Sequence, residues 1–307
     1  MPTHPADTPA EKLRALLKQG RLLLMPCCFD ALSATLIERA GFPLTFMSGF
    51  AVSATRLAMP DTALISYGEM IGQGRDICAA VSIPVIGDGD TGYGNALNVK
   101  RTVAGYARAG FAAVMIEDQL APKRCGHTRG KAVVGKAEAI ARIRAAVDAR
   151  SEHGDILILA RTDARATHGL DEALGRAHAF AEAGADILFV EAPRSEAEME
   201  TIGRELPGWK MINMLEGGDT PVLPPARLEA MGFVLAAYPL TLLSAAARAM
   251  TEALDDLRAG RQNPDRLMDF ATLREVVGFD AYDREARRYA DEADADTPAE
   301  PAGKNPA

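Results

Sequence analysis

The sequence predicts an α/β protein folded as a closed (β/α)8 barrel of the TIM type, with an extra helical extension at its C-terminal end. Eight short apolar runs recur along the chain, and most are followed by apolar residues at helical spacing. Continuous apolar strands that alternate with amphipathic helices indicate parallel strands buried on both faces. A barrel of eight strands uses every run, and a chain of 307 residues accommodates one barrel with extensions.

The first four candidate strands lie in the N-terminal half. They are the runs that start at Leu22, Leu44, Ile83 and Ala112. Ahead of the third run, Ser66 and Glu69 match a capping box, which predicts the start of a helix. Val99, Val103 and Tyr106 are spaced as one face of a helix between the third and fourth strands.

The other four candidate strands follow the same rhythm. They are the runs that start at Ile156, Ile187, Lys210 and Phe233. Apolar residues at helical spacing precede the fifth and sixth of them, at Ile140, Ile143, Val147, Leu170, Leu174, Ala177 and Ala181. The order therefore alternates strand and helix to the end of the eighth strand.

Beyond the eighth predicted strand, the sequence predicts further helices and then a polar tail. The run LTLLSAAARAMTEALDDL, from Leu240, has the pattern of a long helix, and helical residues continue from Pro264 to Arg288. The last residues contain too few apolar groups to offset the entropy of ordering. We predict a segment with a short helix at 1–20, the catalytic barrel at 21–260, a helical extension at 261–290 and a disordered tail at 291–307.

Composition excludes several classes of protein. No run of about 18 apolar residues could span a bilayer, and the N-terminus lacks the features of a secretory signal. A net charge of −8, without a basic patch that contains aromatic residues, argues against nucleic acid as a partner. The four cysteines, Cys27, Cys28, Cys78 and Cys125, have neither zinc-site spacing nor the density of a disulfide framework. We expect a cytoplasmic protein.

An open, doubly wound sheet is the alternative fold. The motif GDGDTG at residues 87–92 matches the glycine pattern of a dinucleotide-binding loop. However, Asp88 and Asp90 would place negative charge against a pyrophosphate, and no acid lies about twenty residues further on to bind a ribose. The barrel is therefore preferred.

Polar residues stand where the predicted strands end, which is where barrel enzymes place reacting groups. These residues are Ser48, Asp88, Glu117, Arg161, Glu191 and Asn213, with Asp90 just beyond the third strand. The four carboxylates would repel one another at one mouth unless a cation lay between them. Oxygen ligands without His or Cys favour Mg²⁺, or else Mn²⁺.

The same strand ends predict an anionic substrate. The planar donor fork of Arg161 suits a substrate carboxylate, and Asn213 offers a neutral donor. Backbone N–H groups near Ser48 and Gly49, at the start of a predicted helix, would suit a further carboxylate. We therefore expect the substrate to be a small polyanion.

Six motifs together resemble the isocitrate lyase/phosphoenolpyruvate mutase superfamily, over about residues 20–290. They are GDGDTGYGN at 87–95, IEDQ at 116–119, KRCGH at 123–127, ARTDA at 160–164, FVEAP at 189–193 and NMLEGG at 213–218. The KRCGH segment is the most specific, and it is similar to the short lyases that act on methylisocitrate and dimethylmalate. Two residues depart from that pattern: Phe46 stands where the short lyases usually have Tyr, and Leu215 where methylisocitrate lyases tend to have a hydroxyl residue.

The resemblance implies a Mg²⁺-dependent homotetramer that exchanges a C-terminal helix between neighbours. Asp88 would bind the metal directly, and Asp61, Asp90, Glu117 and Glu191 would surround it, largely through water. Substrate oxygens would be bound by Ser48, Gly49, Phe50, Gly126, His127, Arg161 and Asn213. A mobile gating loop would bear Lys123, Cys125 and His127, which with Arg161 form the predicted catalytic set.

The predicted reaction is cleavage of a carbon–carbon bond in a 2-hydroxy di- or tricarboxylate. The C2–C3 bond would break to release a 2-oxo acid, and nearby cations would stabilise the carbanion that remains. Cys125 would protonate that carbanion, whereas the base for the hydroxyl proton stays open because of Phe46. The alternatives are an oxaloacetate decarboxylase or hydrolase, a phosphonate mutase of the same superfamily, and a dicarboxylate binder without activity.

Overall fold

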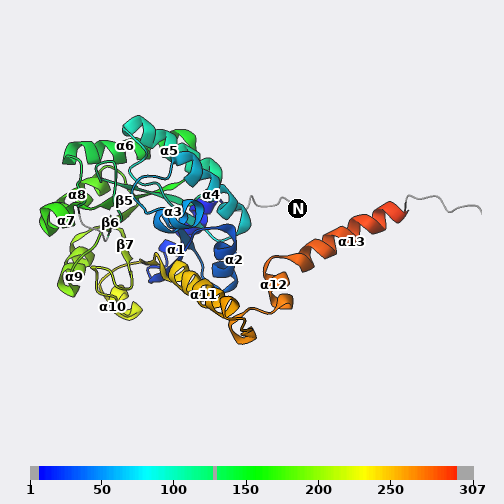
Figure 1. Cartoon of the computed structure of the whole chain (residues 1–307). Helices are drawn as coiled ribbons and strands as arrows, with labels where there is room; N and C mark the ends of the chain where they lie inside the picture. The colour runs from blue at the N-terminus through cyan, green and yellow to red at the C-terminus, as the bar shows by residue number, and fades with distance from the viewer. Residues whose placement is uncertain (1–6, 127–129, 296–307) are drawn as a thin grey trace, which may run out of the picture. The chain divides into compact units, whose positions relative to one another are not determined.

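The computed structural model describes residues 7–126 and 130–295, with side chains through residue 290, and it confirms the barrel. Eight parallel strands pair in chain order, and β1 pairs with β8 to close the sheet. The strands are β1 (Leu23–Cys28), β2 (Thr45–Met47), β3 (Val85–Asp88), β4 (Ala113–Glu117), β5 (Leu157–Thr162), β6 (Ile187–Val190), β7 (Trp209–Asn213) and β8 (Leu235–Tyr238). Helices surround these strands (Figure 1).

The helices of the barrel follow the predicted alternation. They are α1 (Pro9–Leu17), α2 (Ala31–Arg39), α3 (Gly49–Leu57), α4 (Tyr67–Ala80), α5 (Ala96–Ala109), α6 (Lys136–His153), α7 (Ala164–His168), α8 (Leu170–Glu182), α9 (Glu196–Glu205), α10 (Pro225–Ala230) and α11 (Thr241–Arg258). The capping box of Ser66 and Glu69 is confirmed at the start of α4. Val99, Val103 and Tyr106 form the buried face of α5, as their spacing predicts.

Two apolar layers form because successive residues of a strand face opposite sides of the sheet. Cys27 faces the barrel interior with Phe46 and Phe189, whereas Cys28 faces the layer between strands and helices. Both thiols are buried, as their apolar neighbours predict. Helix α1 adds Leu13 and Leu17 to the interior cluster.

The C-terminal part of the chain forms a second compact unit, which begins at Ala249 within α11. It contains a short 3₁₀ helix (Pro264–Arg266), α12 (Phe270–Val276) and α13 (Phe279–Ala295), so the predicted helical extension is divided into separate pieces. Helix α13 continues through residues 291–295, which the sequence places in the disordered tail. Among the described residues, no helix is long and apolar enough to cross a membrane.

Candidate active site

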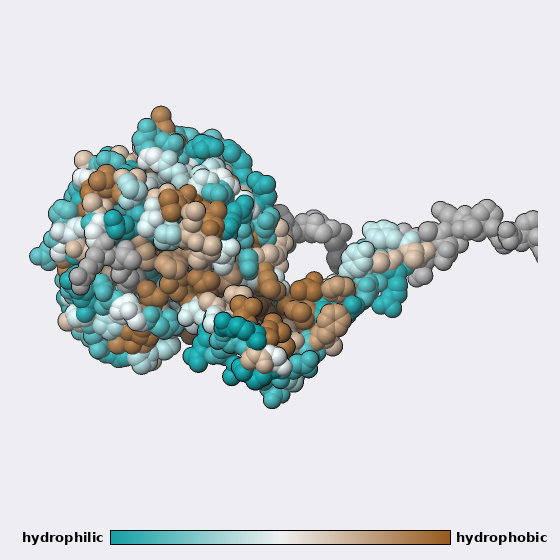
Figure 2. Space-filling model, viewed as in Figure 1, coloured by the Kyte–Doolittle hydropathy of each residue, from teal (hydrophilic) through white to brown (hydrophobic). Residues whose placement is uncertain are grey.

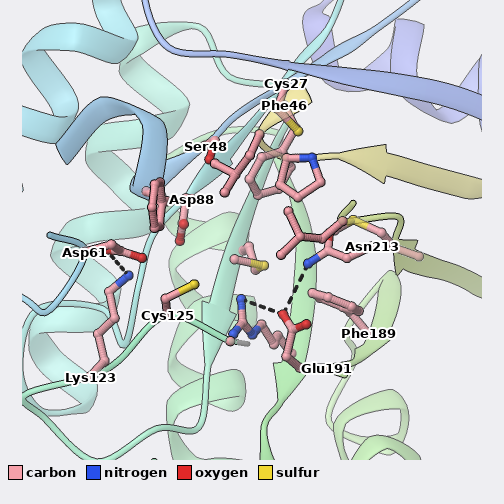
Figure 3. A pocket seen from close by; sticks show the side chains of 18 of the residues that line it. Cys27, Phe46, Ser48, Asp61, Asp88, Lys123, Cys125, Phe189, Glu191 and Asn213 are labelled. Atoms are coloured by element: carbon pink, nitrogen blue, oxygen red, sulfur yellow. Dashed lines mark hydrogen bonds and ion pairs between the residues drawn. The ribbon is translucent and has the colours of Figure 1, made fainter. Parts of the chain in front are cut away.

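A pocket lies at the C-terminal ends of the strands, where the sequence places the reacting groups (Figure 3). Its polar lining consists of Ser48, Asp61, Asp88, Lys123, Arg124, Cys125, Arg161, Glu191 and Asn213. Its apolar lining includes Cys27, Phe46, Phe50, Met115, Phe189, Met211, Leu215, Pro239 and Leu240. The pocket therefore combines a charged part with an apolar part supplied mainly by strands β1, β2, β4, β6 and β7 and by the segments that follow β7 and β8.

One group of charges centres on Lys123. Its ammonium lies 2.5 Å from a carboxylate oxygen of Asp61 and 2.7 Å from one of Asp90, and all three side chains are buried. Burial alone would lower the pKa of Lys123, but the carboxylates of Asp90, Asp88 and Asp61 raise it well above its usual value. Lys123 is therefore charged, and it partly neutralises this acidic group.

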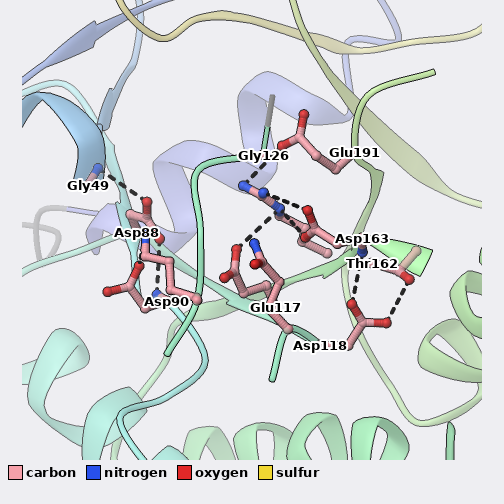
Figure 4. Close-up of polar contacts among 12 residues, drawn as sticks. Gly49, Asp88, Asp90, Glu117, Asp118, Gly126, Thr162, Asp163 and Glu191 are labelled. Carbon is pink, nitrogen blue, oxygen red and sulfur yellow. Dashed lines mark hydrogen bonds and ion pairs between the residues drawn. The ribbon is translucent and has the colours of Figure 1, made fainter. Parts of the chain in front are cut away.

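Asp88, at the end of β3, is also buried. Its Oδ1 accepts the N–H of Asp90 at 3.0 Å, and its Oδ2 accepts the N–H of Gly49 at 3.2 Å (Figure 4). Burial, and then the charge of Asp90, raises the pKa of Asp88 to about 6. Both the protonated and the ionised form of this carboxyl are therefore populated at a pH near 6.

The start of α3 differs from the sequence expectation. Ser48 caps α3 with its side chain, and its backbone N–H donates to the carbonyl of Cys28 within the barrel. The Gly49 N–H donates to Asp88. The helix N-terminus thus binds a carboxylate of the protein itself, and its contact with a substrate carboxylate stays a prediction.

The second group of charges centres on Arg161. The guanidinium lies 2.9 Å from Asp163, 3.0 Å from Glu191 and 3.3 Å from Glu117. Asn213 donates its side-chain N–H to Glu191 at 3.2 Å, so β4, β5, β6 and β7 meet at this group. Figure 4 shows Glu117, Asp163 and Glu191 apart from the Gly49, Asp88 and Asp90 group.

Behind Arg161 lies a buried support that the sequence analysis does not identify. Asp118 accepts the N–H of Asp163 at 2.8 Å and the hydroxyl of Thr162 at 2.7 Å. Arg176, from α8, lies 3.0 Å from Asp118 and neutralises it. The available signal was the second acid of the motif IEDQ, Asp118, and the single acid of ARTDA, Asp163, because neighbouring strand residues face opposite sides.

The segment that contains the KRCGH motif lies over the mouth. Gln119 exchanges two hydrogen bonds with the backbone of Arg124, at 2.8 and 2.9 Å. At Gly126 any side chain would collide, since a Cβ would lie 2.6 Å from Glu191 and 2.7 Å from Arg161. His127, the remaining predicted site residue, lies outside the described residues.

Cys125 stands between the two charged groups. Figure 3 shows its sulfur directed into the pocket, with Asp61 and Lys123 on one side and Glu191 and Asn213 on the other. The side chain is half-buried, unlike those of Cys27 and Cys28. A thiol in this position can reach a ligand that spans both groups.

The acids at the mouth pair with two cations of the protein itself, Lys123 and Arg161. The sequence analysis instead expected a metal ion to offset their repulsion. In the described part of the chain, no three Asp, Glu, His or Cys side chains are arranged to bind one metal ion directly. Within the same residues, Glu117 Oε1 is buried and accepts no hydrogen bond. Burial also raises the pKa of Glu117 well above its usual range. A hard cation held by one or two carboxylates and several waters fits this arrangement.

A family model and the most similar curated proteins all point to one superfamily. Residues 13–258 match the family model described as phosphoenolpyruvate phosphomutase. The chain is 43% identical over 286 residues to 2,3-dimethylmalate lyase of Eubacterium barkeri, covering 92% of this chain and 98% of the relative. It is 37% identical over 295 residues to 2-methylisocitrate lyase of Aeropyrum pernix, covering 94% of each.

Solved structures extend the similarity to other activities. Oxaloacetate acetylhydrolase in complex with 3,3-difluorooxalacetate superposes with a TM-score of 0.87 at 34% identity, over 93% of this chain and 97% of that one. Phosphonopyruvate hydrolase in complex with oxalate and Mg²⁺ superposes with a TM-score of 0.81 at 31% identity, over 92% of this chain and all of that one (100%).

Proposed function

Because this chain belongs to the phosphoenolpyruvate phosphomutase family, within the PEP mutase/isocitrate lyase superfamily, we propose that it is a carbon–carbon lyase. The proposed substrate is a 2-hydroxy dicarboxylate of the alkylmalate type, which is cleaved to a 2-oxo acid and a second carboxylate. The position of Cys125 carries this proposal, because the thiol lies between two charged groups that can bind the two halves of such a substrate.

Each group has a separate role in the proposed reaction. Arg161 and Asn213 bind the carboxylate of the half that becomes a carbanion, and the guanidinium stabilises the charge that gathers there. A base takes the hydroxyl proton, the oxygen forms the carbonyl of the 2-oxo acid, and the electron pair of the broken C2–C3 bond stays on C3. Cys125 then donates its proton to C3.

We propose Mg²⁺ as the cofactor, with Mn²⁺ as a substitute. Asp88 would hold the ion directly, and Asp61, Asp90, Glu117 and Glu191 would hold its waters. The bound ion would polarise the substrate hydroxyl and its adjacent carboxylate. Thorough EDTA treatment should remove activity and added Mg²⁺ should restore it. Full activity in a sample without bound metal would refute this assignment.

The apolar lining supports an alkyl-substituted substrate. Phe46, Leu215 and Leu240 line the pocket, and none can hydrogen-bond the third carboxylate of methylisocitrate. We therefore expect 2,3-dimethylmalate or 2-methylmalate to be preferred over methylisocitrate. The test is release of the 2-oxo acid from each compound, measured as kcat/KM. A clear preference for methylisocitrate would overturn the substrate assignment and leave the lyase intact.

A hydrolase of oxaloacetate is the second candidate, since the oxaloacetate acetylhydrolase structure superposes so well. That hydrolase and a phosphonate mutase would also need a pocket that binds a small anionic substrate. Including oxaloacetate and phosphonopyruvate in the same panel separates the three, because only the lyase forms two carbon products from an alkylmalate.

We also propose a homotetramer in which copies exchange a C-terminal helix. The barrel unit contains an apolar groove lined by Leu24, Leu36, Phe42 and Leu242, and apolar areas are visible on its surface in Figure 2. Within α11, Met250, Leu254 and Leu257 are exposed in the single chain. Light scattering should give the mass of four chains, and a monomer at micromolar concentration would contradict the proposal. The cytoplasmic location stays a prediction.

A further inference from the structure

Lys131 has no role in the reaction described above, yet its side chain is only 3% exposed. Its ammonium lies 2.8 Å from Asp163 Oδ1 and also donates to the backbone carbonyl of Gly126. A buried lysine on a surface segment is costly to desolvate unless its contacts offset that cost. Both contacts therefore need an explanation.

Both partners of Lys131 border Arg161. Asp163 binds the Nε of Arg161 through Oδ2 at 2.9 Å and its Nη2 through Oδ1 at 3.1 Å. The Oδ1 atom is thus shared between Arg161 and Lys131. Gly126 is the residue whose Cβ would lie 2.7 Å from Arg161. Lys131 consequently joins the support of Arg161 to the backbone next to Cys125.

The charge balance around Arg161 gives this contact a further effect. Three carboxylates, those of Glu117, Asp163 and Glu191, surround one guanidinium. Lys131 neutralises part of the charge on Asp163, and this leaves more of the guanidinium's attraction for a ligand carboxylate. Among the described residues, Lys131 is the only lysine that pairs with Asp163.

The segment has a second attachment that does not involve Lys131. Leu120 N–H donates to the Ala132 carbonyl at 2.8 Å, and Val134 N–H donates to the Asp118 carbonyl at 2.9 Å. These bonds fix the base of the segment, far from Cys125 along the chain. Closer to Cys125, Gln119 holds the backbone of Arg124 on one side, and Lys131 holds that of Gly126 on the other.

We propose that Lys131 is a positioning residue, which ties the backbone at Gly126 to Asp163 and so fixes Cys125 relative to Arg161. The effect of Lys131 on turnover rests on the proposed lyase function, whereas its effect on the position of Cys125 does not. A misplacement of about 1 Å can lower turnover by about 10²-fold. We expect Lys131→Met to lower kcat by roughly 10- to 10²-fold, with a smaller change in KM.

The deciding experiment needs no substrate. Iodoacetamide labelling of the resting protein is followed at each cysteine by mass spectrometry, with half-buried Cys78 as an internal reference. The variants are Lys131→Met, Lys131→Gln in case the first does not fold, and Lys136→Met as a control at an exposed lysine nearby. We expect Cys125 to react about 10-fold faster in the Lys131 variants, with Cys78 and the control unchanged.

Two results would overturn the proposal. Equal Cys125 rates in wild type and both Lys131 variants would show that Lys131 does not hold the segment. A parallel rise at Cys125 and Cys78 would show that Lys131 only stabilises the fold. If labelling changes as expected but no alkylmalate is cleaved, the positioning role stands and the proposed function fails.

Discussion

Lys123 and Arg161 each neutralise a set of buried carboxylates at the same mouth, but they are held differently. Arg161 belongs to β5, and behind it Asp163, Asp118 and Arg176 form a continuous buried chain of ion pairs and hydrogen bonds. Lys123 comes from the segment above the mouth, and its ammonium has the acids Asp61 and Asp90 as partners.

From this difference we predict that the Arg161 half of the pocket is rigid and that the Lys123 half can exchange partners. A guanidinium is a rigid donor fork, whereas an ammonium is a point charge on a flexible stem. We therefore expect the Arg161 half to orient the substrate and the Lys123 half to accept a metal ion.

Loss of Asp88 should have the largest effect. Asp88→Ala removes the carboxylate proposed to hold the metal directly, and we expect turnover to fall below detection. Asp90→Asn should retain measurable activity, because a contact through water tolerates an amide. Steady-state kinetics at saturating Mg²⁺ check both, and wild-type activity in Asp88→Ala would exclude the proposed ligand.

Cys125→Ser should cause the next largest loss of turnover, because it replaces the thiol that lies between the two halves of the pocket. A hydroxyl fits the same space but holds its proton too tightly, so we expect kcat to fall by roughly 10² to 10⁴. Binding of Mn²⁺ and of a 2-oxo acid should change little. An unchanged kcat would remove Cys125 from the chemistry.

A side chain at Gly126 should disturb the Arg161 half alone. The added Cβ of Gly126→Ala would lie 2.7 Å from Arg161, and we expect kcat/KM to fall by about 10- to 10²-fold. Gly135→Ala is the matched control, since no atom lies within 4 Å of its added Cβ. Equal losses in the two variants would show that the effect is not local.

The smallest effect concerns the stability of the metal-free protein. The raised pKa of Asp88, about 6 against an ordinary 3.8, means that its protonated form stabilises the fold. That contribution is complete below the ordinary value and is lost as the pH rises through about 6. Relative to Asp88→Asn, the wild type should lose about 1 to 2 kcal/mol between pH 5 and 7.5.

Urea unfolding after EDTA treatment measures this difference. Added Mg²⁺ should restore the stability of the wild type at pH 7.5 but not that of Asp88→Asn. Parallel pH profiles for the two proteins would show that Asp88 does not titrate in this range.

The sequence predicted the barrel because apolar periodicity reports burial directly. The runs at Ile83 and Ile156, for example, became β3 and β5. The strand-end residues Asp88 and Arg161 line one pocket, and Glu117 contacts Arg161. Closure of the barrel brings the C-terminal ends of all eight strands to one mouth. The strand ends alone were therefore enough to predict these residues.

The missed residues lie where periodicity gives no signal. Lys131 is in an irregular segment, and its partner Asp163 lies just beyond the end of β5. Nothing in the spacing shows that Lys123 turns toward Asp61 rather than toward the thiol. These contacts depend on the path of the segment above the mouth, which only the three-dimensional structure gives.

The most direct test of protonation by Cys125 is cleavage of 2,3-dimethylmalate in D₂O, with the propionate product analysed by NMR. A carbanion that is fixed by the Arg161 half and protonated by Cys125 from one side should give propionate with a single deuterium in one configuration. The expected companion product is pyruvate in equal amount. Unlabelled propionate, or an equal mixture of both configurations, would contradict protonation by a fixed thiol.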